Sequence, residues 1–358
     1  MVVTEELNQA KVEAFGEKMF SILNGGAMGM MISIGHRTGL FDAMAKLEPA
    51  TCDRIASAAG LRERYVREWL GAMVTGGIIE YDAPSRTYAL PPEHAAMLTR
   101  AASPNNFAVT TQFLSVLGGV EDQIVERFSE GGGVHYAEFG RFHDVMAEES
   151  AQTVVAGIFD HILPIVPGLT EQLESGIDVL DVGCGRGRAI MAMAARFPRS
   201  RFTGFDFSNE AVDNANSEVR RRGLENIRFE AQDAAAIDPS LRFDLVTAFD
   251  AIHDQAQPHA VLDGIATVLR PSGVFLMQDI EGSSHVEGNL ARPLGAFMYT
   301  ISCMHCMTVS LANDGAGLGA MWGREVALRM LAEAGFNDVT VQNLPHDIIN
   351  AYYVGRKV

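Results

Sequence analysis

Positive charge is scarce in this sequence. Its 358 residues include 28 Lys and Arg against 45 Asp and Glu, which gives a formal charge of −17. Proteins that bind nucleic acids usually carry a basic face that meets the phosphates. The charge balance therefore argues against a nucleic-acid partner.

Cysteine and long apolar runs are scarce as well. Four cysteines in 358 residues are too few for a disulfide framework and indicate a reducing compartment. The uncharged run at 20–35 has 16 residues and four glycines, whereas a membrane-spanning helix needs about 20 apolar residues. The first residues are polar and mixed in charge, unlike a secretory signal. We expect a cytoplasmic protein without a membrane partner.

What the sequence does contain is enough apolar material for two domains, because hydrophobic residues make up 47% of it. Its first part predicts a helix at 51–61, a second helix at 62–77 and two short strands around a Pro-Ser turn within 78–90. This order is typical of a winged helix. We place a helical, winged-helix domain at residues 1–100.

Winged helices often bind DNA, and three arginines of the second helix would form the reading surface: Arg62, Arg64 and Arg67. Against this, Glu63 and Glu68 share that helix, and residues 36–100 hold eight basic and eight acidic side chains. A neutral module on an acidic protein attracts phosphates weakly. We favour a role in homodimer packing and pocket closure, with the Met- and Gly-rich segment 19–35 in the interface or, alternatively, in the core of one chain.

The second half alternates between strand and helix patterns, after connecting helices at 101–170. Strands are predicted at 178–183, 201–207, 227–232, 243–249, 273–279, 338–344 and 350–356, and helices at 188–197, 209–222, 258–269 and 324–334. Such alternation indicates an α/β, Rossmann-like fold with helices on both faces of a mainly parallel sheet. We assign it to residues 171–358, with a lid inserted at 281–322.

A glycine-rich turn follows the first of these strands, in Asp178–Ala189, "DVLDVGCGRGRA". Dinucleotide-binding proteins need G-x-G-x-x-G, whose third small residue lets helix and strand pack closely. Arg188 or Ile190 occupies that third position here, depending on the register. The turn instead has an acid two residues before G-x-G-x-G, and this excludes the dinucleotide interpretation.

Asp181, Gly183, Gly185 and Gly187 together resemble the motif of class I S-adenosylmethionine (SAM) dependent methyltransferases. The resemblance implies that Asp181 meets the ammonium of SAM. Asp206 at the second strand end would accept the ribose hydroxyls, while Phe207 packs on the adenine. The same resemblance implies four further cofactor contacts: Asp233 and Ala234 at the adenine, and Phe249 and Asp250 at the methionine part.

His253-Asp254 follows the fourth strand and is similar to the His-Asp pair of small-molecule O-methyltransferases, especially the plant phenolic enzymes, which also carry a winged-helix dimerisation domain. The resemblance implies that His253 is a general base for a hydroxyl proton, a task that suits the titration range of histidine. Asp254 would orient it, with Glu281 and Glu325 as alternatives. Gln255 stands where that family has Trp, and a His253 that only caps the strand end is the competing interpretation.

The sequence gives the weakest indications for the residues of the acceptor pocket. We expect one apolar wall from Met298, Tyr299, Cys303 and Cys306, and another from Tyr136, Phe139 and His143. Cys303 and Cys306 form C-x-x-C, but a structural zinc site needs four ligands and no second pair exists, so we expect no metal.

The leading hypothesis is therefore methyl transfer from SAM to a small, largely apolar acceptor at a hydroxyl oxygen. Two alternatives stay open: transfer to nitrogen or carbon with His253 not catalytic, and a SAM-responsive winged-helix regulator. The chain also resembles bacterial winged-helix methyltransferases whose substrates are unassigned.

Overall fold

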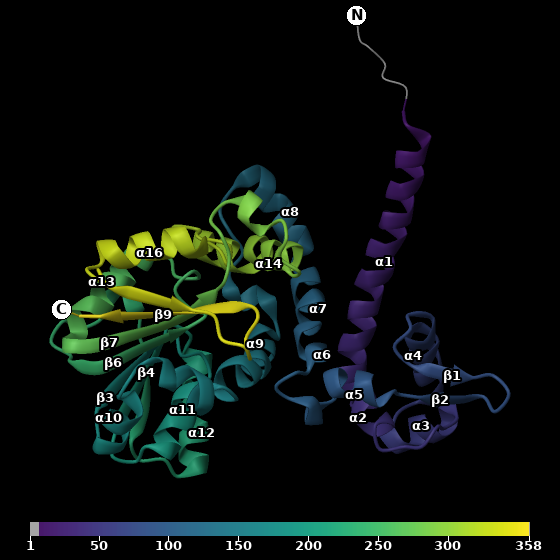
Figure 1. Ribbon diagram of the computed structural model, residues 1–358, viewed down its shortest axis with the longest axis horizontal. Helices are drawn as coiled ribbons and strands as arrows, with labels where there is room; N and C mark the ends of the chain where they lie inside the picture. The colour runs from purple at the N-terminus through teal and green to yellow at the C-terminus, as the bar shows by residue number, and fades with distance from the viewer. Residues whose placement is uncertain (1–6, 358) are drawn as a thin grey trace, which may run out of the picture. The chain divides into compact units, whose positions relative to one another are not determined.

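A computed structural model describes residues 7–357 of the chain (Figure 1). The chain divides into two compact units, residues 1–115 and 116–358. The segment 101–170, which the sequence predicts as one stretch of connecting helices, is thus shared between the two units.

The first unit has the element order of a winged helix, as predicted. Helix α1 (Gln9–Thr38) leads to α2 (Leu40–Met44), α3 (Cys52–Ala59), α4 (Glu63–Thr75), the antiparallel strands β1 (Glu80–Asp82) and β2 (Thr87–Ala89), α5 (Pro92–Leu98) and α6 (Phe107–Thr110). Helix α7 (Gln112–Gly118) spans the boundary between the two units. The core centres on Trp69, whose ring packs edge-on against Phe41 and whose indole N–H donates to the Met31 carbonyl at 2.8 Å. The unit therefore has an apolar core of its own.

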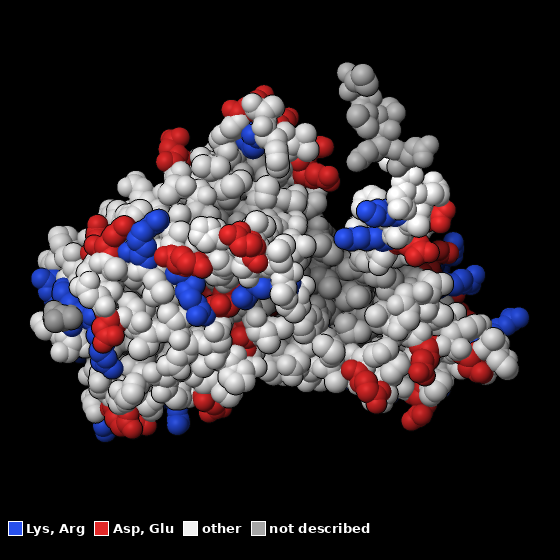
Figure 2. Space-filling view, turned by 45° about the horizontal axis from the view of Figure 1, so that its top comes forward, with Lys and Arg blue, Asp and Glu red and all other residues white. Residues whose placement is uncertain are grey.

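Helix α4 pairs its charges within itself. Arg67 bonds both carboxylate oxygens of Glu63, at 2.8 and 2.9 Å, and Arg64 bonds Glu68. Figure 2 shows blue and red side chains mixed over the visible face of this unit. Two of the three arginines considered for DNA reading are thus already neutralised by acids one turn away.

Helix α1 exposes apolar side chains over much of its length. Its exposed large hydrophobic residues are Val12, Phe15, Met19, Phe20, Ile22, Leu23, Met30 and Ile34. Several recur at helical spacing, as at 12, 15, 19 and 22, so they share one face of the helix. A continuous apolar stripe of this kind marks an interaction surface in many proteins.

The second unit is built on a seven-stranded sheet. Its strands are β3 (Asp178–Val182), β4 (Arg201–Asp206), β5 (Ile227–Ala231), β6 (Phe243–Phe249), β7 (Leu269–Ile280), β8 (Val339–Gln342) and β9 (Asn350–Arg356). The order across the sheet is β5-β4-β3-β6-β7-β9-β8, and only β9 runs antiparallel to its neighbours. The predicted α/β fold with seven strands is confirmed. Strand β7 begins at Leu269, earlier than predicted, because Leu269 pairs with Phe243 ahead of a bulge.

Helices cover both faces of this sheet (Figure 1). One core lies under α10 (Leu169–Ser175), α11 (Arg188–Arg196) and α12 (Asn209–Arg222), and the other under α13 (Pro258–Val268) and α16 (Gly323–Glu333). Alternate residues of β3 serve the two cores, with Val179 in the first and Leu180 and Val182 in the second. Both faces of the sheet are therefore buried, so a ligand-binding site is expected at the ends of its strands.

Two mostly helical segments stand beside the sheet. Before it come α8 (Glu121–Glu130), the short turn η2 (Tyr136–Phe139), α9 (Phe142–Ser150), the π-helical turns η3 (Ala151–Val155) and η4 (Ile158–Ile162), and η5 (Leu163–Ile165). The predicted insertion contains η7 (Val286–Asn289), α14 (Gly295–Ile301), the π-helical turn η8 (Ser302–Cys306) and α15 (Met307–Ala312). Residues 295–312 form a helical stretch that is long and apolar enough to cross a membrane, and 44% of this stretch is buried within the protein. A single stretch of this kind is weak evidence for a membrane span.

Candidate active site

The cavity lies at the point where the strand order of the sheet reverses. β3 starts both halves of the sheet, with β4 on one side and β6 on the other. In such sheets the loops at the carboxyl ends of these strands diverge and leave a crevice. Here they border a cavity of about 310 Å³, which is within the range of small-molecule sites.

The glycine turn forms one wall of this cavity. Gly183, Gly185 and Gly187 all have positive φ, at 69°, 52° and 66°. A Cβ on Gly187 would lie 2.2 Å from the Phe229 ring, and one on Gly183 would lie 2.5 Å from Ala251. A Cβ on Gly185 would meet no atom within 4 Å, and Gly185 lines the cavity. Two glycines thus permit the packing of the turn, while the third leaves bare backbone facing a ligand.

Asp181 presents a buried carboxyl group to the cavity. It pairs in register with Thr247 of β6, whose hydroxyl donates to Asp181 Oδ1 at 2.7 Å. Burial raises the pKa of Asp181 to about 7. A cation in the cavity would favour the ionised form, so this carboxyl suits an ammonium group.

Asp206 has a second role besides the predicted one. Its two carboxylate oxygens accept the backbone N–H groups of Gly185 and Ser208, at 2.8 and 2.9 Å. Burial raises the pKa of Asp206. Asp206 therefore fixes the glycine turn while lining the cavity, and each oxygen keeps room for a further donor.

The other predicted cofactor residues lie around the same cavity, apart from one. Phe207, Asp233, Phe249 and Asp250 line it. Asp233 caps the turn η6 (Ala234–Ala236) by accepting the Ala235 N–H at 2.9 Å. Ala234 itself is buried in the apolar core under α13 and is not among the described residues that line the cavity.

Asp250 holds an unusual backbone conformation at the end of β6. Its φ is 54°, in the left-handed region, and its N–H donates to the Gln278 carbonyl at 2.8 Å. Burial raises the pKa of Asp250 to about 7. Strain of this kind is found at functional sites, where the surrounding structure holds the residue in place.

His253 is held by an acid that the sequence analysis did not select. Its Nδ1 lies 2.8 Å from Oδ1 of Asp279, a fully buried residue of β7. The same oxygen accepts the Trp322 indole N–H at 3.0 Å. Of the two alternatives considered, Glu281 instead bonds Arg324, and Glu325 accepts bonds from Ser283 and Ser284. The signal for Asp279 was an acid at the end of the predicted strand 273–279, after the apolar run Val274–Met277.

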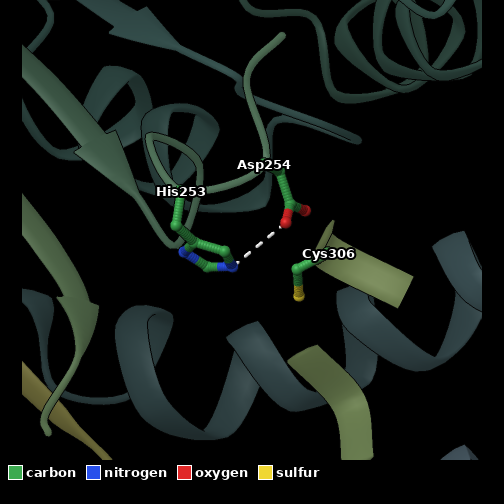
Figure 3. Close-up of side chains that lie close together, drawn as sticks. All are labelled: His253, Asp254 and Cys306. Atoms are coloured by element: carbon green, nitrogen blue, oxygen red, sulfur yellow. Dashed lines mark ion pairs between the residues drawn. The ribbon is translucent and has the colours of Figure 1, made fainter. Parts of the chain in front are cut away.

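The opposite ring nitrogen of His253 faces Asp254, the next residue in the sequence. Nε2 lies 3.1 Å from Asp254 Oδ1 (Figure 3). Burial disfavours the imidazolium, but the carboxylates of Asp279 and Asp254 outweigh it and raise the pKa of His253 well above its usual value. Burial likewise disfavours the Asp254 carboxylate, yet the His253 charge lowers the pKa of Asp254 to about 2. Asp254 lines the cavity, so it lies between the buried imidazole and a ligand.

An aromatic cluster forms the wall opposite the glycine turn. Tyr136, His143 and Phe142 line the cavity, and Phe142 stacks on the His305 ring with 3.5 Å between centroids. Phe139 packs edge-on against His305 behind that wall. Two of the three residues predicted for this side thus border the cavity, and Phe142 was missed.

The residues predicted for the other pocket wall lie elsewhere. Met298 and Cys306 belong to an apolar cluster with Ile280 and Met321, and the Tyr299 hydroxyl accepts a bond from Asn289. Neither these residues nor Cys303 are among the described residues that line the cavity. Val309 and Asn313, from α15 and just after it, line it from the inserted segment.

The cavity fits the predicted cofactor by the chemistry of its donors. Asp181 offers a carboxylate for an ammonium, Gly185 offers open backbone, and Asp206 and Asp233 offer acceptors for hydroxyl and amino groups. Arg186, ion-paired to Asp144 at 2.6 Å, also lines the cavity and supplies a positive charge for a carboxylate. These groups match the polar ends of SAM.

Comparison with known proteins agrees with this architecture. Residues 173–335 match the family described as a methyltransferase domain, and residues 26–100 match the Rv2258c-like winged HTH domain. The chain joins a winged-helix domain to a methyltransferase domain. The predicted combination of domains is thus confirmed.

The individual proteins that resemble this chain in sequence match it over less than half of its length. The fatty-acid O-methyltransferase of Mycolicibacterium smegmatis is 33% identical over 104 residues, which is 29% of this chain and 37% of that protein. The 27-O-demethylrifamycin SV methyltransferase of Amycolatopsis mediterranei is 28% identical over 141 residues, which is 38% of this chain and 50% of that protein. The chain therefore spans half or less of the length of these relatives.

The fold as a whole has solved counterparts. Human N-acetylserotonin methyltransferase, solved in complex with SAM, superposes with a TM-score of 0.69. That match covers 100% of this chain and 99% of the human chain at 17% identity. At this identity the likeness establishes the fold of a SAM-dependent methyltransferase with an N-terminal helical domain.

Proposed function

We propose that the protein transfers a methyl group from SAM to a hydroxyl oxygen of a small, largely apolar molecule. The observation that carries this is the position of Asp254, which lines the cavity in front of His253, itself backed by Asp279. A hydroxyl group that accepts a methyl must lose its proton, and this chain of groups is suited to take it. The transfer of the methyl group from sulfur to oxygen does not by itself require such a chain, whereas the loss of the hydroxyl proton does.

SAM supplies an electrophilic methyl group on a sulfonium, and the protein's residues hold and align it. Asp181 would bind the amino group of SAM and Arg186 its carboxylate, and the bare backbone of Gly185 would contact the adjacent part of SAM. Asp206 would bind the ribose and Asp233 the adenine. Phe207, which is exposed at the cavity, would pack on the adenine ring. In-line displacement needs little beyond this positioning.

His253 and Asp254 act on the acceptor. Neutral His253 holds a proton on Nδ1 toward Asp279, which leaves Nε2 as the basic atom beside Asp254. The hydroxyl donates to the Asp254 carboxylate, and its proton passes to Nε2 as the oxygen–carbon bond forms. Asp279 then stabilises the imidazolium, and Trp322 keeps the Asp279 carboxylate in place.

The lining of the cavity favours an apolar acceptor. Besides the cofactor acids, its apolar side chains include Phe142, Met146, Ala256 and Val309. Its other polar side chains include Ser150, Gln255 and Asn313. Apolar side chains with a few polar ones are typical of small-molecule sites. The M. smegmatis relative is a fatty-acid O-methyltransferase, so long-chain acids belong among the candidate acceptors.

The test is a search for methyl transfer. Purified full-length protein is incubated with methyl-labelled SAM and a panel of apolar phenols, alcohols and acids, each with an amine or thiol analogue of the same shape. We expect label on oxygen for at least one acceptor. Label on nitrogen or carbon, with His253→Ala still active, would favour the alternative in which His253 is not catalytic.

The regulator hypothesis is tested separately. Ion pairs on α4 and the formal charge of −17 disfavour DNA binding. A gel-shift titration with duplex DNA at low salt should show no saturable complex. A complex that responds to SAM would overturn the enzyme-only proposal.

We also propose that the protein forms a homodimer through its N-terminal domain. The exposed apolar stripe of α1 supports this, since such a surface is costly to leave in water. The cytoplasmic location stays a prediction.

A further inference from the structure

A second chemical feature lies beside the proposed proton path. His253, Asp254 and Cys306 bring an imidazole nitrogen, a carboxylate oxygen and a thiol together, and these three atoms all lie within 4.8 Å of one another (Figure 3). His253 and Asp254 follow β6, whereas Cys306 ends the π-helical turn η8 of the inserted segment. Residues about fifty positions apart thus converge on one point.

The separation between the nitrogen and oxygen donors suits a tetrahedral ion. Zinc bonds of about 2.0 Å to nitrogen or oxygen and about 2.3 Å to sulfur place neighbouring donors about 3.3–3.6 Å apart. His253 Nε2 and Asp254 Oδ1 are 3.1 Å apart, close to that requirement. Imidazole, carboxylate and thiolate are also the donors zinc prefers, whereas Mg²⁺ and Ca²⁺ favour oxygen alone.

His305 gives an independent sign of a missing ligand. It is completely buried, yet neither of its ring nitrogens has a hydrogen-bond partner among residues 7–357. Leaving buried polar nitrogens unpaired is costly. Its ring is fixed by stacking on Phe142, and its Nδ1 lies 4.0 Å from Asp254 Oδ2. An ion held by Asp254 would therefore lie near an imidazole that lacks a hydrogen-bond partner among the described residues.

We propose that His253 Nε2, an Asp254 carboxylate oxygen and Cys306 Sγ bind a zinc ion. Binding releases the Cys306 thiol proton and, where His253 is protonated, the proton on Nε2. The two anionic ligands then balance the charge of the ion, which removes the penalty of burying it. Asp254 lines the cavity, so the ion has a path of entry. The C-x-x-C pair considered from the sequence contributes only one of its two cysteines.

A consequence follows for the activity, and this part rests on the proposed function. An ion on Nε2 occupies the atom that would accept the hydroxyl proton. Zinc would therefore inhibit methyl transfer, and a chelator would restore it. The binding itself is independent of whether an acceptor is ever found.

The binding test uses full-length protein treated with a chelator and then titrated with Zn²⁺ against a chromogenic competitor. We expect about one ion per chain, and Cys306→Ser should weaken affinity by at least about 10-fold, the smallest loss seen when even an outer partner of a metal ligand is removed. Cys303→Ser is the matched control, because Cys303 lies on the same turn but outside the cluster. Its affinity should equal that of the wild type.

Cobalt gives a second readout that does not depend on stability. Co²⁺ bound to the wild type and to Cys303→Ser should show a thiolate charge-transfer band, and Cys306→Ser should lose it. Asp254→Asn should weaken Zn²⁺ binding without removing the cobalt band. Equal zinc affinity in Cys306→Ser and wild type, or a cobalt band that follows Cys303, would overturn the proposal. Failure to find methyl transfer would leave these outcomes unchanged.

Discussion

At the scale of single residues, His253 differs from a free histidine because carboxylates face both of its ring nitrogens. Asp279 and Asp254 favour the imidazolium and raise its pKa well above the usual value, against the effect of burial. A general base must be neutral to accept a proton. The proposed reaction should therefore accelerate as pH rises through a pKa that is higher than that of an ordinary histidine.

Removing one of these acids should shift the pH dependence. Asp279→Asn takes away a carboxylate, so the pKa of His253 falls and the rising part of the rate profile moves to lower pH. Turnover with saturating SAM and acceptor, measured across pH for both proteins, tests this. Glu281→Gln is the control, because Glu281 lies two residues away but bonds Arg324. Profiles that are identical for wild type and Asp279→Asn would exclude the predicted influence on His253.

Asp181 should control the affinity for SAM. Burial raises its pKa to about 7, so the carboxyl is neutral below that pH and ionised above it. An ammonium group binds the ionised form, and SAM affinity should rise through this range and then level off. Asp181→Asn keeps an acceptor for Thr247 but not the charge, and we expect it to bind SAM about 10–100-fold more weakly, since bonds to charged groups contribute about 1.5–3 kcal/mol.

Isothermal titration calorimetry one unit below and above pH 7 would measure both effects on Asp181. Thr247→Val serves as a control that removes the buried hydrogen bond but keeps the acid. It should raise the pKa of Asp181 further, because the Thr247 hydroxyl lowers that pKa. An Asp181→Asn protein with unchanged affinity and unchanged pH dependence would contradict the assignment.

At the scale of elements, the glycine turn separates packing from ligand contact. Gly185→Ala and Gly187→Ala both put a side chain at positive φ, which costs about 1–2 kcal/mol. Gly187→Ala also drives a Cβ into Phe229, which adds about 1–3 kcal/mol. We expect Gly187→Ala to lose more unfolding free energy, and Gly185→Ala to lose SAM affinity out of proportion to its smaller loss of stability.

Urea unfolding and calorimetric SAM binding on the same two proteins distinguish these losses. Gly223→Ala is a useful reference, because Gly223 also has positive φ, ends α12 and has no atom within 4 Å of an added Cβ. It should show the backbone cost alone. If Gly185→Ala and Gly223→Ala bound SAM equally well, Gly185 would not face the cofactor.

Elements that repeat a simple pattern could be predicted from the sequence. The strands that carry Asp181 and Asp206, and the strand that precedes Asp233, alternate with helices. Acids at successive strand ends mark one edge of a sheet. Partners from distant segments could not be predicted, because the sequence does not show which segments meet in the fold. Asp279, Trp322 and Phe142 reach the site in this way.

The inserted segment shows the same limit. A helical pattern at 295–312 does not reveal the π-helical turn at 302–306, where the extra residue per turn changes which side chains face inward. His305 and Cys306 of this turn are buried. Met298 and Tyr299, predicted for the pocket from their apolar character, instead pack or bond within the insertion.

At the scale of the whole molecule, the long apolar face of α1 raises the question of assembly. Phe20 and Leu23 are 69% and 71% exposed, although they are among the largest apolar side chains of the helix. Val12, Phe15, Met19 and Ile22 continue the surface with the spacing of a helix–helix contact. A second copy of this chain carries the same stripe, and a two-fold interface can pair the two.

A charge placed in this stripe should dissociate the proposed dimer. Leu23→Asp, or Phe20→Asp with Leu23→Asp, would bury a carboxylate in the apolar interface of the dimer, whereas in the monomer the carboxylate stays in water. The cost of burying the charge therefore favours the monomer. Light scattering coupled to gel filtration should report a dimer for the wild type and a monomer for the variants. Phe128→Asp is the control, since Phe128 is equally exposed on α8 but lies outside the stripe, and it should remain dimeric. A monomeric wild type at all accessible concentrations would overturn the proposal, and retention of SAM binding in the Leu23→Asp monomer would show that α1 serves assembly and not the fold of the site.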